Sequence, residues 1–283
     1  MLRLLVADGN DRAGRARHVR VCGKTSAETY AGVLRALAPD AACDLLAPAD
    51  GDAALPAGLA AYDGLVFTGS SLRVAEGGPA VARQVALMRA ALTEGVPVFG
   101  SCWGVQVAAV LAGGAAGANP RGPEYGFARN IAPTGPGRAH PLLAGRPPAY
   151  DAPAIHSDAV IAAPPGSTVL AANGRLDVQA IALDYEAGTF WGTQYHPELD
   201  LDEVAAMLRL SAGEIVAAGF CGDAAGVTAH AQALRDLHAD PDGRADLAWR
   251  FGLGPEVLEA GLRRREIRSF LDALVRPTRA RRR

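Results

Sequence analysis

Four short apolar segments in the first hundred residues constrain the fold most strongly. Each is a continuous run of Leu, Val, Phe and Ala rather than a polar–apolar alternation, which is typical of strands covered on both faces. Segments with helical periodicity lie between them, and this order predicts parallel strands joined by right-handed crossovers. The expected strands are residues 3–8, 43–47, 64–68 and 96–100, and the expected helices are 26–38, 79–93 and 103–112. We therefore predict an α/β fold, with a doubly wound, mostly parallel sheet and helices on both faces.

The second half of the chain has a different texture. After residue 120, short strand-like segments are separated by Pro, Gly and Asn turns. A helix is expected over residues 201–217, with Asp200 as its N-cap. Two or three helices are expected over 222–283, most clearly at 228–237 and 255–275. We predict a main domain of residues 1–220 and a helical C-terminal extension, 221–283, with a basic, Arg-rich tail.

Charge and cysteine usage exclude several classes of protein. The 28 Lys and Arg against 30 Asp and Glu give a net charge of −2, whereas nucleic-acid binding normally requires a basic excess. The charge balance therefore predicts no nucleic-acid partner. No run of eighteen apolar residues is present, so we also expect no membrane span. The four cysteines are far apart without a CxxC pair, which argues against a zinc site or a disulfide framework. We expect a cytoplasmic protein.

The most informative motif is Gly100-Ser101-Cys102-Trp103-Gly104, between the fourth apolar run and a helical pattern. A strand-to-helix turn of the form glycine-x-nucleophile-x-glycine is a nucleophile elbow, which raises its central side chain above the sheet. The N-terminus of the following helix favours a thiolate, and its free N–H groups can stabilise an oxyanion. An isolated cysteine is more often buried and inert. Strand, glycines and helix together favour Cys102 as a nucleophile.

A second motif, Gln194-Tyr195-His196-Pro197-Glu198, follows a strand-like segment. In an extended chain residues i and i+2 point the same way, so His196 and Glu198 leave the strand on one side. A thiol nucleophile needs a base, and the base needs a carboxylate that orients its ring. The alternative is a surface turn with an incidental histidine. Together with the elbow, the motif predicts a catalytic triad of Cys102, His196 and Glu198.

These two motifs, in this order within residues 1–215, resemble those of the class I glutamine amidotransferases of the triad type. The resemblance is greatest to the glutaminase domain of GMP synthase and its free-standing relatives. Glu124-Tyr125-Gly126 resembles the short Glu-Tyr-Gly signature of this branch. It implies a flavodoxin-like, doubly wound fold and the same triad. It further implies attack on the side-chain amide of glutamine, a γ-glutamyl thioester, release of ammonia and hydrolysis to glutamate. This chemistry needs no metal and no cofactor, and none is expected.

The resemblance also assigns an oxyanion hole to the backbone N–H groups of Ser70 and Trp103. Thr68-Gly69-Ser70-Ser71 stands where the family usually has a Ser-Gly-Gly-Pro-like turn. Ser70 replaces the second glycine of that turn. The backbone donor survives this change only if the local φ is accessible to a non-glycine residue.

The substrate-binding residues are expected from the same resemblance. Gln106 matches a family position that contacts glutamine, and residues 155–158 resemble the loop whose main chain holds the α-amino and α-carboxylate groups. A purely structural role for His156 and Asp158 stays open. The expected substrate-binding residues are Gly69, Gln106, His156, Ser157 and Asp158.

Several functions are compatible with this chemistry. The sequence has no pyrophosphatase loop and no Walker A motif for activating an acceptor. We therefore expect a glutaminase whose ammonia passes to a separate acceptor or synthetase partner. One alternative is a γ-glutamyl peptidase or hydrolase, since the acyl-enzyme is the same and only the leaving group differs. Another is a non-catalytic scaffold that binds a partner.

Overall fold

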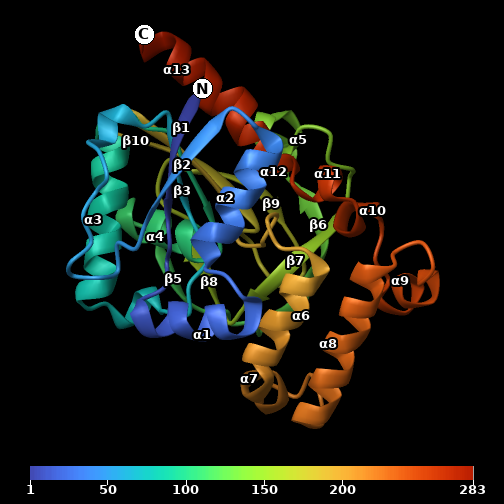
Figure 1. Ribbon diagram of the computed structural model, residues 1–283. Helices are drawn as coiled ribbons and strands as arrows, with labels where there is room; N and C mark the ends of the chain where they lie inside the picture. The colour runs from blue at the N-terminus through green and yellow to red at the C-terminus, as the bar shows by residue number, and fades with distance from the viewer. Residues whose placement is uncertain (283) are drawn as a thin grey trace.

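The computed structural model describes residues 1–282, and its centre is a nine-stranded mixed sheet (Figure 1). The strand order is β2-β1-β3-β4-β11-β10-β9-β6-β7. The pairs from β2 to β11 are parallel and the pairs from β11 to β7 are antiparallel. The strands are β1 (Leu2–Ala7), β2 (Ala41–Leu46), β3 (Gly64–Phe67), β4 (Val98–Ser101), β6 (Glu124–Pro133), β7 (Tyr150–His156), β9 (Thr168–Ala172), β10 (Ala180–Tyr185) and β11 (Gly188–Thr193). A separate antiparallel pair consists of β5 (Ala115–Ala118) and β8 (Asp158–Ala162).

The predicted α/β architecture is confirmed. The four expected parallel strands are β1 to β4, and the three expected helices are α2 (Ser26–Leu37), α3 (Pro79–Thr93) and α4 (Trp103–Leu111). Helix α1 (Arg12–Cys22), between β1 and α2, was not predicted. Helix α2 is capped by Thr25, whose side chain accepts from Glu28 N while Glu28 reaches back to Thr25 N. This capping box fixes the start of α2.

The two faces of the sheet form separate parts of the core. Alternate residues of β1 pack on opposite faces, Leu4 and Val6 on one and Leu5 and Ala7 on the other. Helix α2 covers the first face, and helices α3 and α4 cover the second. The sheet is thus buried on both sides, as its continuous apolar runs indicate.

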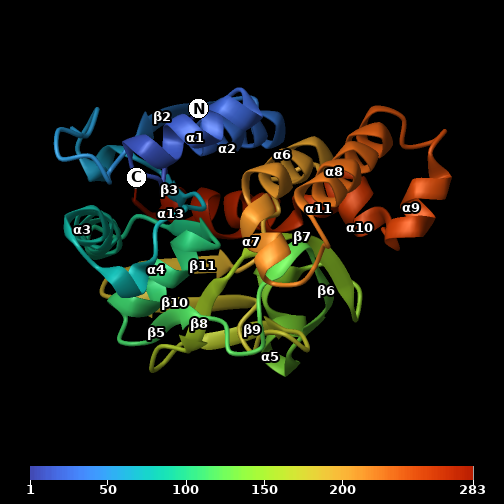
Figure 2. The ribbon, with the colours of Figure 1, turned by 90° about the horizontal axis from the view of Figure 1, so that it is seen from below.

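The helices after residue 200 are more broken than the sequence suggests. Asp200 caps α6 (Leu201–Leu210) as predicted, but the helix ends at Ser211, whose φ of −93° and ψ of 12° leave the helical range, and α7 (Ala212–Ala217) follows. Helices α8 (Ala224–Ala239) and α9 (Ala245–Phe251) lie at the end of the molecule opposite α3 (Figure 2). The expected helix 255–275 is divided into α10 (Pro255–Leu258), α11 (Ala260–Arg263), α12 (Arg265–Ser269) and the π-helical segment η4 (Phe270–Val275), before α13 (Arg276–Arg282). The remaining short helices are η1 (Leu59–Ala61), η2 (Val74–Glu76), α5 (Gly135–Ala139) and η3 (Pro141–Leu143).

The last helical segments pack into the core of the sheet. Phe270 of η4 is fully buried, and its ring centroid lies 5.6 Å from that of Phe99 on β4. Glu266 of α12 is also fully buried and accepts hydrogen bonds from Arg146 and from the Tyr195 hydroxyl. The division into residues 1–220 and 221–283 remains a prediction, and residues 265–275 share the core of the first part.

We expect Phe270→Ala to lower the free energy of unfolding by about 3–5 kcal/mol, because it removes a buried aromatic ring and leaves a cavity beside Phe99. Urea unfolding followed by circular dichroism measures the change. Trp249→Ala is the control, since the Trp249 side chain is 86% exposed and its loss should cost no more than about 0.5 kcal/mol. Equal stability of the two variants would show that η4 does not stabilise the core.

Candidate active site

Cys102 lies in the tight turn between β4 and α4. Its φ of 49° and ψ of −98° place it in a region that non-glycine residues rarely occupy. The glycines on either side allow this turn. A methyl group on Gly100 would lie 2.8 Å from the Gly104 carbonyl carbon, and one on Gly104 would lie 2.9 Å from Phe67 Cβ. The strand and the helix therefore approach closely enough to form the predicted elbow.

His196 and Glu198 follow β11, the strand that pairs with β4. His196 Nδ1 lies 2.7 Å from Glu198 Oε1, and the two side chains are only 9% and 3% exposed. Burial alone would lower the pKa of His196. The charge of Glu198 and hydrogen bonds with Cys102 and Glu198 outweigh burial and raise this pKa to about 10. Since Nδ1 is occupied by Glu198, Nε2 is the ring nitrogen left for the thiol.

Glu198 is also held by two hydroxyl groups that the sequence did not reveal. Ser101 Oγ donates to Glu198 Oε1 at 3.1 Å, and Tyr30 Oη lies 3.0 Å from Oε2 and 2.7 Å from Ser101 Oγ. Burial and the charge of Glu198 raise the pKa of Tyr30 well above its usual value, so its hydroxyl stays a donor. Together with His196, these groups surround a buried carboxylate with donors from three segments of the chain.

The turn after β3 lies against the imidazole. A methyl group on Gly69 would approach His196 Cε1 to 2.8 Å, so this position leaves room only for glycine. Ser70 is not among the non-glycine residues of positive φ in the described part of the chain. The serine that replaces the family's second glycine is therefore compatible with the turn. The N–H of Trp103 belongs to the first turn of α4, where backbone donors have no intrahelical acceptor.

The loop at residues 156–158 is fixed by buried polar contacts. His156 Nε2 lies 3.0 Å from Glu124 Oε2. Burial opposes ionisation of Glu124, but the hydrogen bond and charge of His156, with amides of neighbouring side chains, lower its pKa. Gln106 Nε2 donates to the Asp158 carbonyl at 3.0 Å, and Arg73 lies 3.3 Å from the Asp158 carboxylate. The side chains of His156 and Gln106 thus hold the loop in place.

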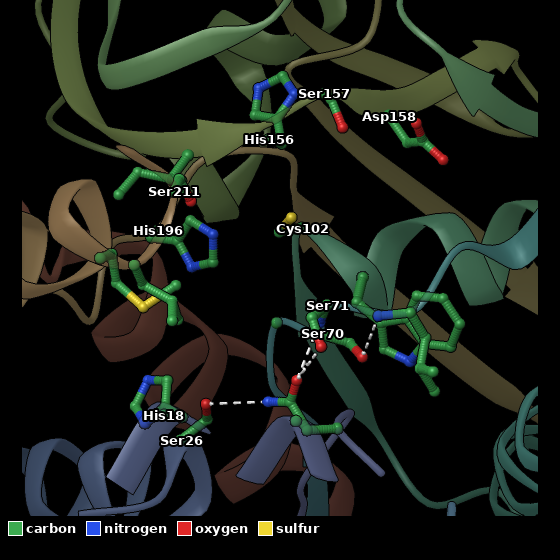
Figure 3. A pocket seen from close by; sticks show the side chains of 18 of the residues that line it. His18, Ser26, Ser70, Ser71, Cys102, His156, Ser157, Asp158, His196 and Ser211 are labelled. Carbon is green, nitrogen blue, oxygen red and sulfur yellow. Dashed lines mark hydrogen bonds between the residues drawn. The ribbon is translucent and has the colours of Figure 1, made fainter. Parts of the chain in front are cut away.

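One cavity, of about 330 Å³, is lined by the triad, the turn after β3 and the loop 156–158, whereas Tyr30, Ser101 and Glu124 lie behind this lining. Figure 3 shows Cys102 between His156, Ser157 and Asp158 on one side and His18 and Ser26 on the other, with His196 beside it. Every residue predicted from the sequence lines this cavity: Gly69, Ser70, Cys102, Trp103, Gln106, His156, Ser157, Asp158, His196 and Glu198. Sequence reasoning missed Arg73 and the contributions of α1 and α6, because their approach depends on how the helices pack.

Residues 1–282 contain neither a metal-binding cluster nor a membrane-spanning helix. In this part of the chain, no three His, Cys, Asp or Glu side chains come together in a way that could hold a metal ion. No helix within these residues is long and apolar enough to cross a membrane.

Comparison with known proteins defines the family. The family model described as glutamine amidotransferase class-I matches residues 47–212. The chain belongs to the class-I glutamine amidotransferases. The matched residues span Cys102, His196 and Glu198, and the match confirms the family resemblance stated from the sequence.

Two relatives of this chain differ in how much of it they match. A γ-glutamyl-L-1-hydroxyisopropylamide hydrolase from a Pseudomonas species is 34% identical over 98% of this chain and 94% of its own length. One subunit of a glutamine-hydrolyzing GMP synthase from Ignicoccus hospitalis is 33% identical over 52% of this chain and 72% of its own length. Among solved structures, a glutamine amidotransferase from Thermotoga maritima covers 97% of this chain and 98% of its own at a TM-score of 0.59 and 16% identity. The structural likeness shows the same fold, including the C-terminal helices.

The raised pKa of His196 has a consequence for stability. A group whose pKa rises on folding from 6.5 to about 10 adds stability that is fully present below pH 6.5 and is lost as the pH rises through about 10. Glu198→Gln removes the charge that raises this pKa. We expect the difference in unfolding free energy between wild type and Glu198→Gln to shrink between pH 6 and pH 10 by at least about 1.4 kcal/mol, the equivalent of one pKa unit.

Urea unfolding at pH 6, 8 and 10 measures this difference. Glu94→Gln, at an exposed position on the end of α3, is the matched control and should give a pH-independent difference. A difference between wild type and Glu198→Gln that stays constant over this range would contradict the charged His196–Glu198 pair.

Proposed function

We propose that the protein hydrolyses γ-glutamyl amides through a covalent thioester at Cys102. One observation carries the proposal: His196 lies between an elbow cysteine and a buried glutamate, with Nδ1 hydrogen-bonded at 2.7 Å to Glu198. This arrangement activates a nucleophile and keeps the base in one tautomer and orientation. Cys102 is the proposed nucleophile, His196 the base and Glu198 the residue that orients the base.

The proposed reaction has two halves. The proton of Cys102 lies on His196 Nε2, as the raised pKa of His196 favours, and the thiolate sulfur attacks the γ-glutamyl carbonyl carbon to form a tetrahedral oxyanion. His196 returns the proton to the amide nitrogen as the C–N bond breaks, which releases the amine and leaves the thioester. His196 then deprotonates water, which attacks the thioester. The C–S bond breaks, the new γ-carboxyl group loses its proton to water as glutamate leaves, and the Cys102 thiolate again lies beside the protonated His196.

Backbone donors supply the remaining stabilisation in this proposal. The N–H groups of Ser70 and Trp103 donate hydrogen bonds to the oxyanion. Ser70 follows Gly69, which lies against His196, and Trp103 is the first residue of α4. Preorganised donors of this kind contribute about 2.7–4 kcal/mol each to transition-state stabilisation. The loop 156–158, held by Gln106 and Arg73, binds the amino-acid end of the glutamyl group.

The amine half of the substrate separates two candidate functions. The Pseudomonas relative, named for its action on γ-glutamyl-L-1-hydroxyisopropylamide, matches nearly the whole chain, including α1 and the C-terminal helices. This similarity favours a γ-glutamyl conjugate of a small amine as the substrate. The second candidate is glutamine, with ammonia passed to a separate synthetase, and the similarity to the Ignicoccus GMP synthase chain favours it.

We expect Cys102→Ala to lower glutamate release by about 10⁴-fold or more, since loss of a nucleophile removes the covalent pathway. His196→Ala should cost nearly as much, and Glu198→Gln less. The assay measures glutamate released from L-glutamine and from a γ-glutamyl alkylamide, with purified protein. Turnover that persists in Cys102→Ala would refute the thioester mechanism, and a biological role that survives this change would favour a scaffold.

Tyr30 is proposed as a positioning residue, because its hydroxyl reaches Glu198 rather than the substrate. Tyr30→Phe should lower kcat about tenfold with KM nearly unchanged, since a hydrogen bond to a charged group is worth about 1.5–3 kcal/mol at most. It should also move the pH profile of kcat, because the carboxylate next to His196 loses a donor. Tyr62→Phe is the control: Tyr62 is likewise buried and donates to Asp44, outside the cavity. Equal pH profiles for wild type and Tyr30→Phe would leave Tyr30 a structural residue only.

A further inference from the structure

The cavity extends past Cys102 toward the first two helices. His18 of α1 and Ser26 at the start of α2 line it, and Figure 3 shows both on the side of Cys102 away from His156, Ser157 and Asp158. Met207 and Leu210 of α6, the helix against which α1 packs, also line the cavity. The proposed triad and the turn at residues 68–71, which carries the proposed oxyanion donor Ser70, do not account for this part of the cavity.

Helix α1 lies directly against Ser71, in the turn at residues 68–71. A methyl group on Gly14 would lie 2.8 Å from Ser71 Oγ and 2.9 Å from Asn10 Oδ1, so only a glycine allows this approach. Asn10 Oδ1 accepts from Ser71 N at 2.9 Å, and Asn10 Nδ2 reaches Ser26 Oγ at 3.5 Å. A continuous set of polar contacts therefore joins the turn beside His196 to Ser26.

His18 presents one defined hydrogen-bonding atom to this space. Its Nδ1 lies 2.8 Å from the Lys24 carbonyl, and a carbonyl can only accept, so Nδ1 carries a proton. In the neutral ring Nε2 is then an acceptor. Nε2 has no hydrogen-bond partner among the described residues, and it is not one of their fully buried unpartnered atoms. Because His18 is a buried residue that lines the cavity, this acceptor is available to a ligand there.

The two ends of the cavity differ in charge. At the end beside the loop 156–158, Arg73 and Asp158 form an ion pair, which suits the charged amino and carboxylate groups of a glutamyl moiety. At the near end, beside α1 and α2, the polar groups are the buried His18 imidazole and the half-buried Ser26 hydroxyl. Lys24 is paired with Glu203 at 2.8 Å, and the exposed Arg17 donates to Ser71 Oγ at the rim. The near end thus favours an uncharged, hydroxylated group beside the apolar side chains of α6.

We propose that His18 and Ser26 form a subsite for the amine half of the substrate, and that this amine is a small amino alcohol, like the hydroxyisopropylamine of the amide for which the Pseudomonas relative is named. The hydroxyl group donates to His18 Nε2 and the alkyl carbons contact Met207 and Leu210. The inference rests on the proposed function, because only a γ-glutamyl amide brings an amine to this position.

Four substrates test the proposal. They are the γ-glutamyl amides of 2-aminopropan-1-ol, isopropylamine and alanine, which are nearly equal in size, together with glutamine, and kcat/KM is measured for each. Wild type should prefer the 2-aminopropan-1-ol amide. In His18→Asn, which can keep the donor to the Lys24 carbonyl but lacks Nε2, the ratio of kcat/KM for this amide over the isopropylamide should fall about tenfold, as for loss of one buried hydrogen bond.

The controls separate this subsite from the proposed function. His230→Asn, on α8 and outside the cavity, should leave the ratio unchanged. Ser26→Ala, one residue after the N-cap Thr25, is a second test variant and should also lower the ratio if His18→Asn fails to fold. Hydrolysis of glutamine alone, preference for the alanine amide, or an unchanged ratio in both variants would overturn the subsite while the thioester mechanism stands. Absence of turnover on all four would overturn both.

Discussion

The buried carboxylate of Glu198 is the interaction on which the site depends. A charge at 3% exposure is tolerated only when donors surround it, and here they come from His196, Ser101 and Tyr30. These donors belong to the segment after β11, the end of β4 and helix α2. Satisfying one anion therefore fixes the positions of the elbow, the imidazole and a covering helix relative to one another.

Local sequence determined much of the fold because the parallel strands are continuous apolar runs bounded by glycine and proline. Helix α1 was not predicted because its sequence is polar and it buries only Gly14 and His18. Its stability comes from packing against α6 and against Ser71 in the turn after β3. The sequence also did not reveal that the expected helix 255–275 is broken into several short helices. Its short helices are directed by distant contacts, such as those of Phe270 with Phe99 and of Glu266 with Arg146.

The site was predictable where neighbours in sequence are neighbours in space. His196 and Glu198 are two residues apart, and Cys102 is marked by its flanking glycines. Tyr30 had no such mark, since a tyrosine on the apolar face of a helix is an ordinary core residue until its hydroxyl is seen beside a carboxylate. The same holds for His18, because only the Lys24 carbonyl beside Nδ1 identifies Nε2 as the acceptor.

The burial of Glu266 beside Tyr195, one residue before His196, also has a consequence for the order in which the core forms during translation. Residues 265–275 leave the ribosome long after β1 and β4, yet they complete the core on one face of the sheet. A nascent chain that has already made Cys102 and His196 still lacks this support. This face of the core can therefore be completed only after residues 265–275 have been synthesised, late in translation.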